Sequence, residues 1–156
     1  MNSYERVMTA LSHKQPDRVP FFLCFTFYGA KELGMDIRKY FSKAEHVVEG
    51  QKRLLDKFGH DCLYPFFHAA LEAHAFGQDI EFYEDGPPNA GRPVIRGRKD
   101  IFELKTPDPA DNEKLLEAVK AVELLSREFR KKTPVISAVI GPYSLPVMLM
   151  GLNKWL

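Results

Sequence analysis

The sequence predicts an α/β fold with three parallel strands, helices between the strands, and an inserted polar hairpin. Three short runs, Val19–Phe25, Cys62–Phe66 and Val135–Ile140, are almost wholly apolar and do not alternate with polar residues. This pattern is typical of strands that are buried on both faces of a parallel sheet. The segments between the runs carry apolar residues at helical spacing, and strands that alternate with helices favour a parallel sheet.

The first predicted helix begins after Asn2, because Asn2 and Glu5 have the spacing of a capping box. It ends before Pro16, since proline cannot continue a helix from inside. The first strand follows, with Pro20 near its start, where a missing N–H is tolerated. A loop with short helical turns over residues 28–41 leads to the second unit.

The second unit begins with another capping box, formed by Ser42 and Glu45, which predicts a helix up to Gly59. Gly59 suits the left-handed residue that commonly follows a helix. The second strand comes next, and a short helix over residues 69–76 is stopped by Gly77.

The third unit contains the polar insertion. Residues 78–83 are predicted as a strand, residues 84–91 as a loop, and residues 93–97 as a segment that pairs back in a hairpin. Asp108 is then predicted to cap a long helix, and a last helix is expected from Tyr143. The predicted buried stripe of the long helix comprises Leu115, Leu116, Val119, Val122, Leu125 and Phe129.

Composition excludes several classes of protein. The 156 residues carry 22 basic and 21 acidic side chains, so the charge gives no argument for nucleic-acid binding. The two cysteines, Cys24 and Cys62, cannot form a disulfide framework and fit a reducing compartment. No apolar run approaches the roughly 20 residues of a membrane span, and no signal peptide is recognisable. We therefore expect a cytoplasmic protein without membrane or nucleic-acid partners.

Three strands are too few to close a barrel, which needs about eight strands and roughly 250 residues. The last helix also lacks a C-terminal capping signal and ends on Trp155 and Leu156. We expect the chain to be the N-terminal portion of one larger domain. Exposed strand edges and an uncovered apolar face would then favour self-association.

The candidate site lies beyond the carboxyl ends of the strands, where ligands bind in parallel α/β folds. His68 is the candidate catalytic residue, because burial behind two phenylalanines would shift its pKa. Glu72 lies one helical turn later and is placed to orient it. The alternatives are a histidine that stabilises the following turn and a solvated glutamate. The candidate substrate-binding residues are Cys24, Thr26, Tyr28, Phe67, Glu72 and Tyr143.

The sequence predicts no metal site in this chain. His68 and His74 are six residues apart and do not share a helix face. His60, Asp61 and Cys62 are adjacent, and adjacent strand residues point to opposite faces. These side chains are therefore not expected to converge on one ion.

Several segments together resemble the uroporphyrinogen decarboxylase-like superfamily. They are the opening Tyr4-Glu5-Arg6-Val7, residues 16–20 (Pro-Asp-Arg-Val-Pro), residues 58–61 (Phe-Gly-His-Asp), residues 72–77 (Glu-Ala-His-Ala-Phe-Gly) and residues 141–145 (Gly-Pro-Tyr-Ser-Leu). The resemblance covers all 156 residues. It implies that residues 1–156 are the N-terminal part of a single (β/α)8 TIM-barrel domain.

One branch of this superfamily decarboxylates uroporphyrinogen in porphyrin biosynthesis without a cofactor. Its members carry arginines after the first strand that bind substrate carboxylates, whereas residues 25–31 here contain none. The position of the decarboxylase aspartate corresponds to His68, and that of its tyrosine to Met148. The resemblance to this branch is thus weakest at the residues that carry the chemistry.

The other branch moves a methyl group from a corrinoid carrier to a thiol such as coenzyme M and uses zinc to activate the thiol. The segments 72–77 and 141–145 are more similar to this branch. The resemblance implies a methyltransferase whose zinc ligands lie in a C-terminal half outside this chain, with a corrinoid protein or small molecule as partner. We then expect residues 1–156 alone to be inactive. A tetrapyrrole decarboxylase and a non-catalytic corrinoid or tetrapyrrole binding module are the alternatives.

Overall fold

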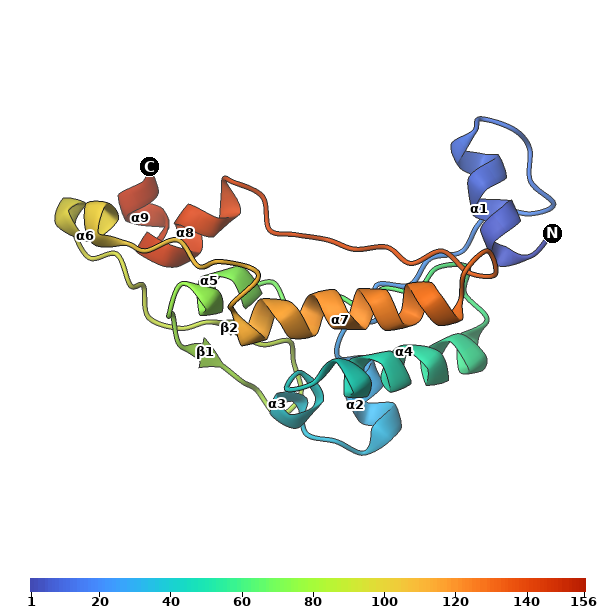
Figure 1. The fold of residues 1–156 in the computed structure, drawn as a ribbon, viewed down its shortest axis with the longest axis horizontal. Helices are drawn as coiled ribbons and strands as arrows, with labels where there is room; N and C mark the ends of the chain where they lie inside the picture. Colours follow the sequence, from blue (N-terminus) through green and yellow to red (C-terminus); the bar gives the residue numbers. More distant parts are fainter.

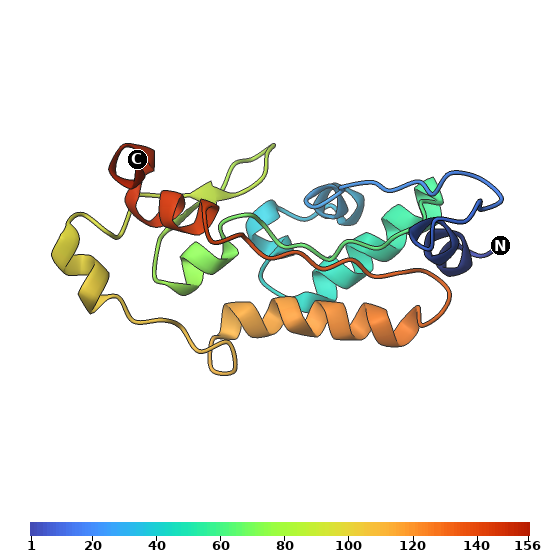
Figure 2. The same ribbon diagram turned by 90° about the horizontal axis from the view of Figure 1, so that it is seen from above.

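Three extended segments run side by side through the middle of the structure, a computed structural model that describes residues 1–156. They lead from the region of the N-terminus toward the region of the C-terminus (Figures 1 and 2). Helices α4 (Ala44–Phe58) and α7 (Glu113–Glu128) pack against each other along one face of these segments. The arrangement is therefore a layer of extended chain covered by helices.

The remaining elements are short. A two-stranded antiparallel ribbon pairs Ile80 with Ala90. No helix has the length and apolar character needed to cross a membrane. The bounds are α1 (Ser3–Leu11), α2 (Tyr28–Leu33), α3 (Ile37–Tyr40), α5 (Leu71–Ala75), β1 (Ile80–Glu81), β2 (Asn89–Ala90), α6 (Arg98–Glu103), α8 (Ser144–Met150) and α9 (Leu152–Trp155).

The three predicted strands are neighbours in the predicted order, but their hydrogen bonding is sparse. Leu63 N donates to Pro134 O at 2.8 Å, and Ile136 N donates to Leu63 O at 2.9 Å, which makes one parallel bridge. Asp61 N donates to Phe21 O at 2.6 Å and joins the first segment to the second. The prediction of three regular strands is therefore wrong, although the second and third segments do pair in parallel.

A buried glutamine partly replaces the missing ladder between the first and second segments. Gln51, on α4 and 1% exposed, donates from Nε2 to Phe25 O at 2.7 Å. Its Oε1 accepts from Tyr64 N at 2.9 Å. One side chain thus satisfies a backbone acceptor on one segment and a backbone donor on the other.

Burial differs between the segments. The middle segment is buried, with Cys62 and Leu63 in the core. Val19 in the first segment is 83% exposed and Val139 in the third is 80% exposed. The prediction of burial on both faces is wrong for these two segments, because the long helices α4 and α7 cover the extended layer along one face (Figure 2).

Asp61 anchors the N-terminal helix to the second segment. It is fully buried and accepts from Ser3 Oγ at 2.9 Å, Arg6 Nη1 at 2.7 Å and Phe21 N at 2.8 Å. Arg18 donates to both carboxylate oxygens, at 2.8 and 3.0 Å. Three segments that support the resemblance to the superfamily therefore meet in one buried cluster.

The helix predictions are partly confirmed. The capping box of Asn2 and Glu5 and the left-handed Gly59 are present. The predicted box at Ser42 is wrong, since Ser42 Oγ donates to the carbonyl of Lys39. Helix α4 begins instead at Ala44.

The polar insertion and the long helix differ more from their predictions than α1 and α4 do. In the ribbon, residues 80–81 pair with residues 89–90 and not with the predicted segment 93–97. Helix α6 was not predicted. Helix α7 is capped by Asn112, whereas Asp108 caps the turn before it. Its buried residues are Ala121 and Leu125. Three of the six residues of the predicted stripe, Leu115, Val119 and Val122, line an apolar groove beside the third segment instead.

Candidate functional site

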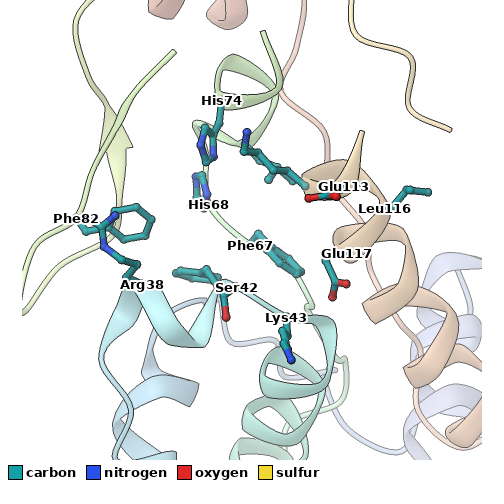
Figure 3. Close-up of a pocket in the computed structure, with 13 residues that line it drawn as sticks. Arg38, Ser42, Lys43, Phe67, His68, His74, Phe82, Glu113, Leu116 and Glu117 are labelled. Carbon is teal, nitrogen blue, oxygen red and sulfur yellow. The ribbon is translucent and has the colours of Figure 1, made fainter. Parts of the chain in front are cut away.

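Two cavities meet at His68, beyond the end of the middle segment. The strand-end cavity has a volume of about 650 Å³ and includes Thr26, Phe66 and Asp85 in its lining. The helix-side cavity, of about 580 Å³, lies among α3, α5 and the N-terminal ends of α4 and α7 (Figure 3). His68 belongs to both linings, so it is the residue through which the two cavities adjoin.

His68 is a buried and neutral imidazole. Its side chain is enclosed by aromatic rings, with ring centroids 5.6 Å from Phe41 and 6.4 Å from Phe82, and the residue is only 5% exposed. Burial, and secondarily the nearby His74, lower the pKa of His68 to about 4. Its Nδ1 has no hydrogen-bond partner. At neutral pH it therefore offers one donor and one acceptor to a ligand.

His74 is the closest polar neighbour of His68 among the cavity residues labelled in Figure 3. The two ring centroids are 6.5 Å apart, because α5 begins at Leu71 and the chain turns between the two histidines. The two rings therefore lie near each other in space, although the residues do not share a helix face. Burial and the charge of Lys114 lower the pKa of His74 as well.

The zinc ion implied by the resemblance would need several ligand side chains that converge on one point. No three His, Cys, Asp or Glu side chains come together closely enough to hold a metal ion. The residues described here therefore do not fit the zinc ion that the resemblance implies, and we assign no chemical step in this chain to zinc.

Glu72 does not orient His68. Its Oε1 accepts from Ile140 N at 3.0 Å, so the side chain connects α5 to the third segment. Its Oε2 is buried without a hydrogen-bond partner and lies at the apolar groove beside α7. The expected interaction fails because one helical turn carries Glu72 toward the third segment rather than toward His68.

The remaining candidate residues are divided between the cavities and the surface. Thr26 lines the strand-end cavity and Phe67 lines the helix-side cavity. Cys24 is exposed and lines neither. Tyr28 is also exposed and stacks on Phe27, with ring centroids 5.0 Å apart.

Tyr143, a predicted substrate-binding residue, lies at the surface rather than in either cavity. It is 59% exposed and packs edge-on against Trp155, with ring centroids 5.8 Å apart. It belongs to neither of the two cavity linings. The structure thus brings Thr26, Phe67 and His68 together and leaves Tyr143 outside.

Several residues of the two cavity linings were not identified from the sequence. Arg38, from α3, lies over the ring of Phe82 with 4.4 Å between its Cζ and the ring centroid. Tyr83 and Asp85 line the strand-end cavity from the polar insertion. The cluster of Gly86 with two prolines predicts a loop, but nothing in it indicates that the loop folds over His68.

Comparison with known proteins identifies the family. A family model described as "Uroporphyrinogen decarboxylase (URO-D)" matches residues 2–156. The chain belongs to this family. The URO-D chain is 27% identical, over 97% of its length, to a methylcobamide:CoM methyltransferase, MtbA, of Methanosarcina mazei. It is 30% identical over 91 residues to a uroporphyrinogen decarboxylase of Wigglesworthia glossinidia brevipalpis.

A solved structure has the same fold as this chain. The URO-D chain superposes on a methyltransferase from Methanosarcina mazei with a TM-score of 0.82 and 14% sequence identity, over 99% of the present chain. It covers 48% of that structure and 45% of MtbA from the same organism. The chain therefore spans about half the length of these relatives.

Proposed function

We propose that the protein carrying this URO-D chain transfers a methyl group from a corrinoid to a thiol, coenzyme M being one such acceptor. The observation that carries the proposal is the neutral His68 at the junction of the two cavities. A uroporphyrinogen decarboxylase would be expected to have an anionic side chain there. The two methyltransferases similar to nearly the whole chain support the same reaction class.

In the proposed reaction the thiol first loses its proton to solvent. The sulfur–methyl bond then forms as the cobalt–methyl bond breaks, and the electron pair of that bond stays on cobalt. With a pKa of about 4, His68 is too weak a base to remove the proton of an ordinary thiol. Its role is to hold a hydrogen bond to the ligand. Thr26 contributes a hydroxyl group to the same strand-end cavity. Zinc activation of the thiol would require ligands from outside residues 1–156.

The absence of arginine between Phe25 and Lys31 argues against the decarboxylase alternative. Uroporphyrinogen carries several carboxylates, and planar guanidinium groups are the usual bidentate partners of carboxylates. The only basic residue of this stretch, Lys31, is paired with Asp85 at 2.5 Å. The lining of the strand-end cavity likewise contains no lysine or arginine to bind a polycarboxylate.

The test is a parallel assay of the protein in its natural length. One arm follows the absorbance change of methylcobalamin when coenzyme M and zinc are supplied, and the other follows CO₂ release from uroporphyrinogen. We expect thiol-dependent loss of methylcobalamin and no CO₂ release. CO₂ release without loss of methylcobalamin would assign the protein to the decarboxylases. Binding of either compound without turnover would favour a binding module.

A further inference from the structure

Three cationic side chains border the helix-side cavity without a carboxylate partner. Arg38 comes from α3, Lys43 directly precedes α4, and Lys114 lies in the first turn of α7. None of them takes part in an ion pair, although the nearby Lys120 is paired with Glu45 at 2.6 Å. Free positive charge is therefore concentrated around this cavity.

The two carboxylates of the cavity lining are engaged elsewhere. Glu117 Oε2 accepts from Ala44 N at 2.5 Å and thereby caps α4, whose N-terminal side has no side-chain cap of its own. Glu113 is the first residue of α7, where the helix dipole favours a negative charge. Both carboxylates lie on the α7 side of the cavity in Figure 3. Neither neutralises the three cations by direct pairing.

The cavity also contains a buried polar atom without a partner. His68 Nδ1 is inaccessible to solvent and accepts or donates no hydrogen bond, which is rare for buried polar atoms in native structures. Phe41, Phe67 and Phe82 form an aromatic floor next to His68. The cavity thus combines a cationic rim, an unsatisfied imidazole and an apolar floor.

We propose that the helix-side cavity binds a phosphate monoester. The positive charge of Arg38, Lys43 and Lys114 around the cavity would attract the dianionic phosphate group, and the apolar part of the ester would lie on the aromatic floor. A volume of 580 Å³ suits a small organic molecule. This cavity shares only His68 with the strand-end cavity. The proposal does not depend on methyl transfer, and neither does its test.

Calorimetric titration of the full chain with phenyl phosphate, inorganic phosphate and phenol tests the proposal. We expect saturable binding of phenyl phosphate at one site, no binding of phenol, and affinity about tenfold weaker for inorganic phosphate because the ring adds hydrophobic stabilisation. Lys43→Ala and Lys114→Ala should each weaken phenyl phosphate binding about tenfold, as expected for a charge-assisted hydrogen bond. Lys132→Ala, beyond the opposite end of α7, should leave the affinity unchanged.

A further variant is expected to strengthen phenyl phosphate binding rather than weaken it. Glu117→Gln keeps an oxygen acceptor for Ala44 N but removes a negative charge from the lining, so it should tighten binding. Circular dichroism verifies that each variant is folded. Failure of phenyl phosphate to bind, wild-type affinity in all three cavity variants, or equal affinity for inorganic phosphate would each overturn the proposal.

Discussion

Replacing Asp61 by Asn should destabilise the fold by about 3 kcal/mol, the low end of the cost of breaking a buried ion pair. The substitution preserves the shape of the side chain but removes the charge that Arg6 and Arg18 share. Arg6 is the larger loss, because it is buried and its Nη1 lies 2.7 Å from Asp61. The low end applies because Arg6 keeps Asp17 as a partner, and because the side chain of Arg18 is half exposed.

Urea denaturation followed by circular dichroism measures this loss. Asp56→Asn on the exposed side of α4 is the matched control, and its stability should stay within about 0.5 kcal/mol of wild type. A loss below about 1 kcal/mol for Asp61→Asn would refute the reasoning, since it would mean that the cluster contributes no more than a surface pair.

The pH dependence gives an independent check of the same cluster. Burial alone would raise the pKa of Asp61, but hydrogen bonds from Phe21 N, Ser3, Arg6 and Arg18 hold it below its ordinary value of 3.8. A carboxyl whose folded pKa is depressed stabilises the fold above the unfolded pKa. The stability difference between wild type and Asp61→Asn should therefore be constant above about pH 5 and shrink as the pH falls below 3.8.

Three further predictions follow from the packing and the ionisation. Gly50→Ala should lower the free energy of unfolding, measured by urea denaturation, by about 1–3 kcal/mol. An added Cβ would lie 2.7 Å from Tyr40 Cε2 and 2.9 Å from Gly29 Cα. Gln51→Leu should cost about 2 kcal/mol in the same assay, because a backbone donor and a backbone acceptor lose their partner. Wild type should lose stability as the pH falls from 6.5 toward 4, where the unfolded His68 binds a proton and the folded one does not. His68→Gln should lose less over that range, and an unchanged slope would contradict the burial argument.

The parts of the fold that were predictable are those that local signals determine. The capping box at Asn2 and the left-handed Gly59 depend on residues within one helical turn, and both are present. The start of α4 was mispredicted because its cap comes from Glu117, 73 residues away in the sequence. A long-range cap of this kind has no local pattern.

In the strands and the site, too, features set by local sequence were predictable and features set by long-range packing were not. An apolar run such as Val135–Ile140 indicates extended chain, but it does not determine how many ladder hydrogen bonds form, and the second and third segments share only the bridge between Leu63 and Val135. The position of His68 at a segment end was predictable from the rule for parallel folds. The proximity of His74 to His68 and the position of Arg38 over Phe82 were not, because both depend on how α3 and α5 pack in the fold.

The most direct test of the proposed function is the effect of His68→Ala on the rate of methyl transfer in the protein at its natural length. Loss of the hydrogen bond from His68 should lower kcat/KM for methylcobalamin and coenzyme M about tenfold, since a hydrogen bond between neutral groups contributes about 1 kcal/mol. His46→Ala on α4, outside both cavities, should retain the wild-type value. His68→Asp should not produce CO₂ release from uroporphyrinogen, because the stretch from Phe25 to Lys31 still lacks arginine. Wild-type turnover in His68→Ala would contradict the account and leave His68 as a residue of the turn before α5.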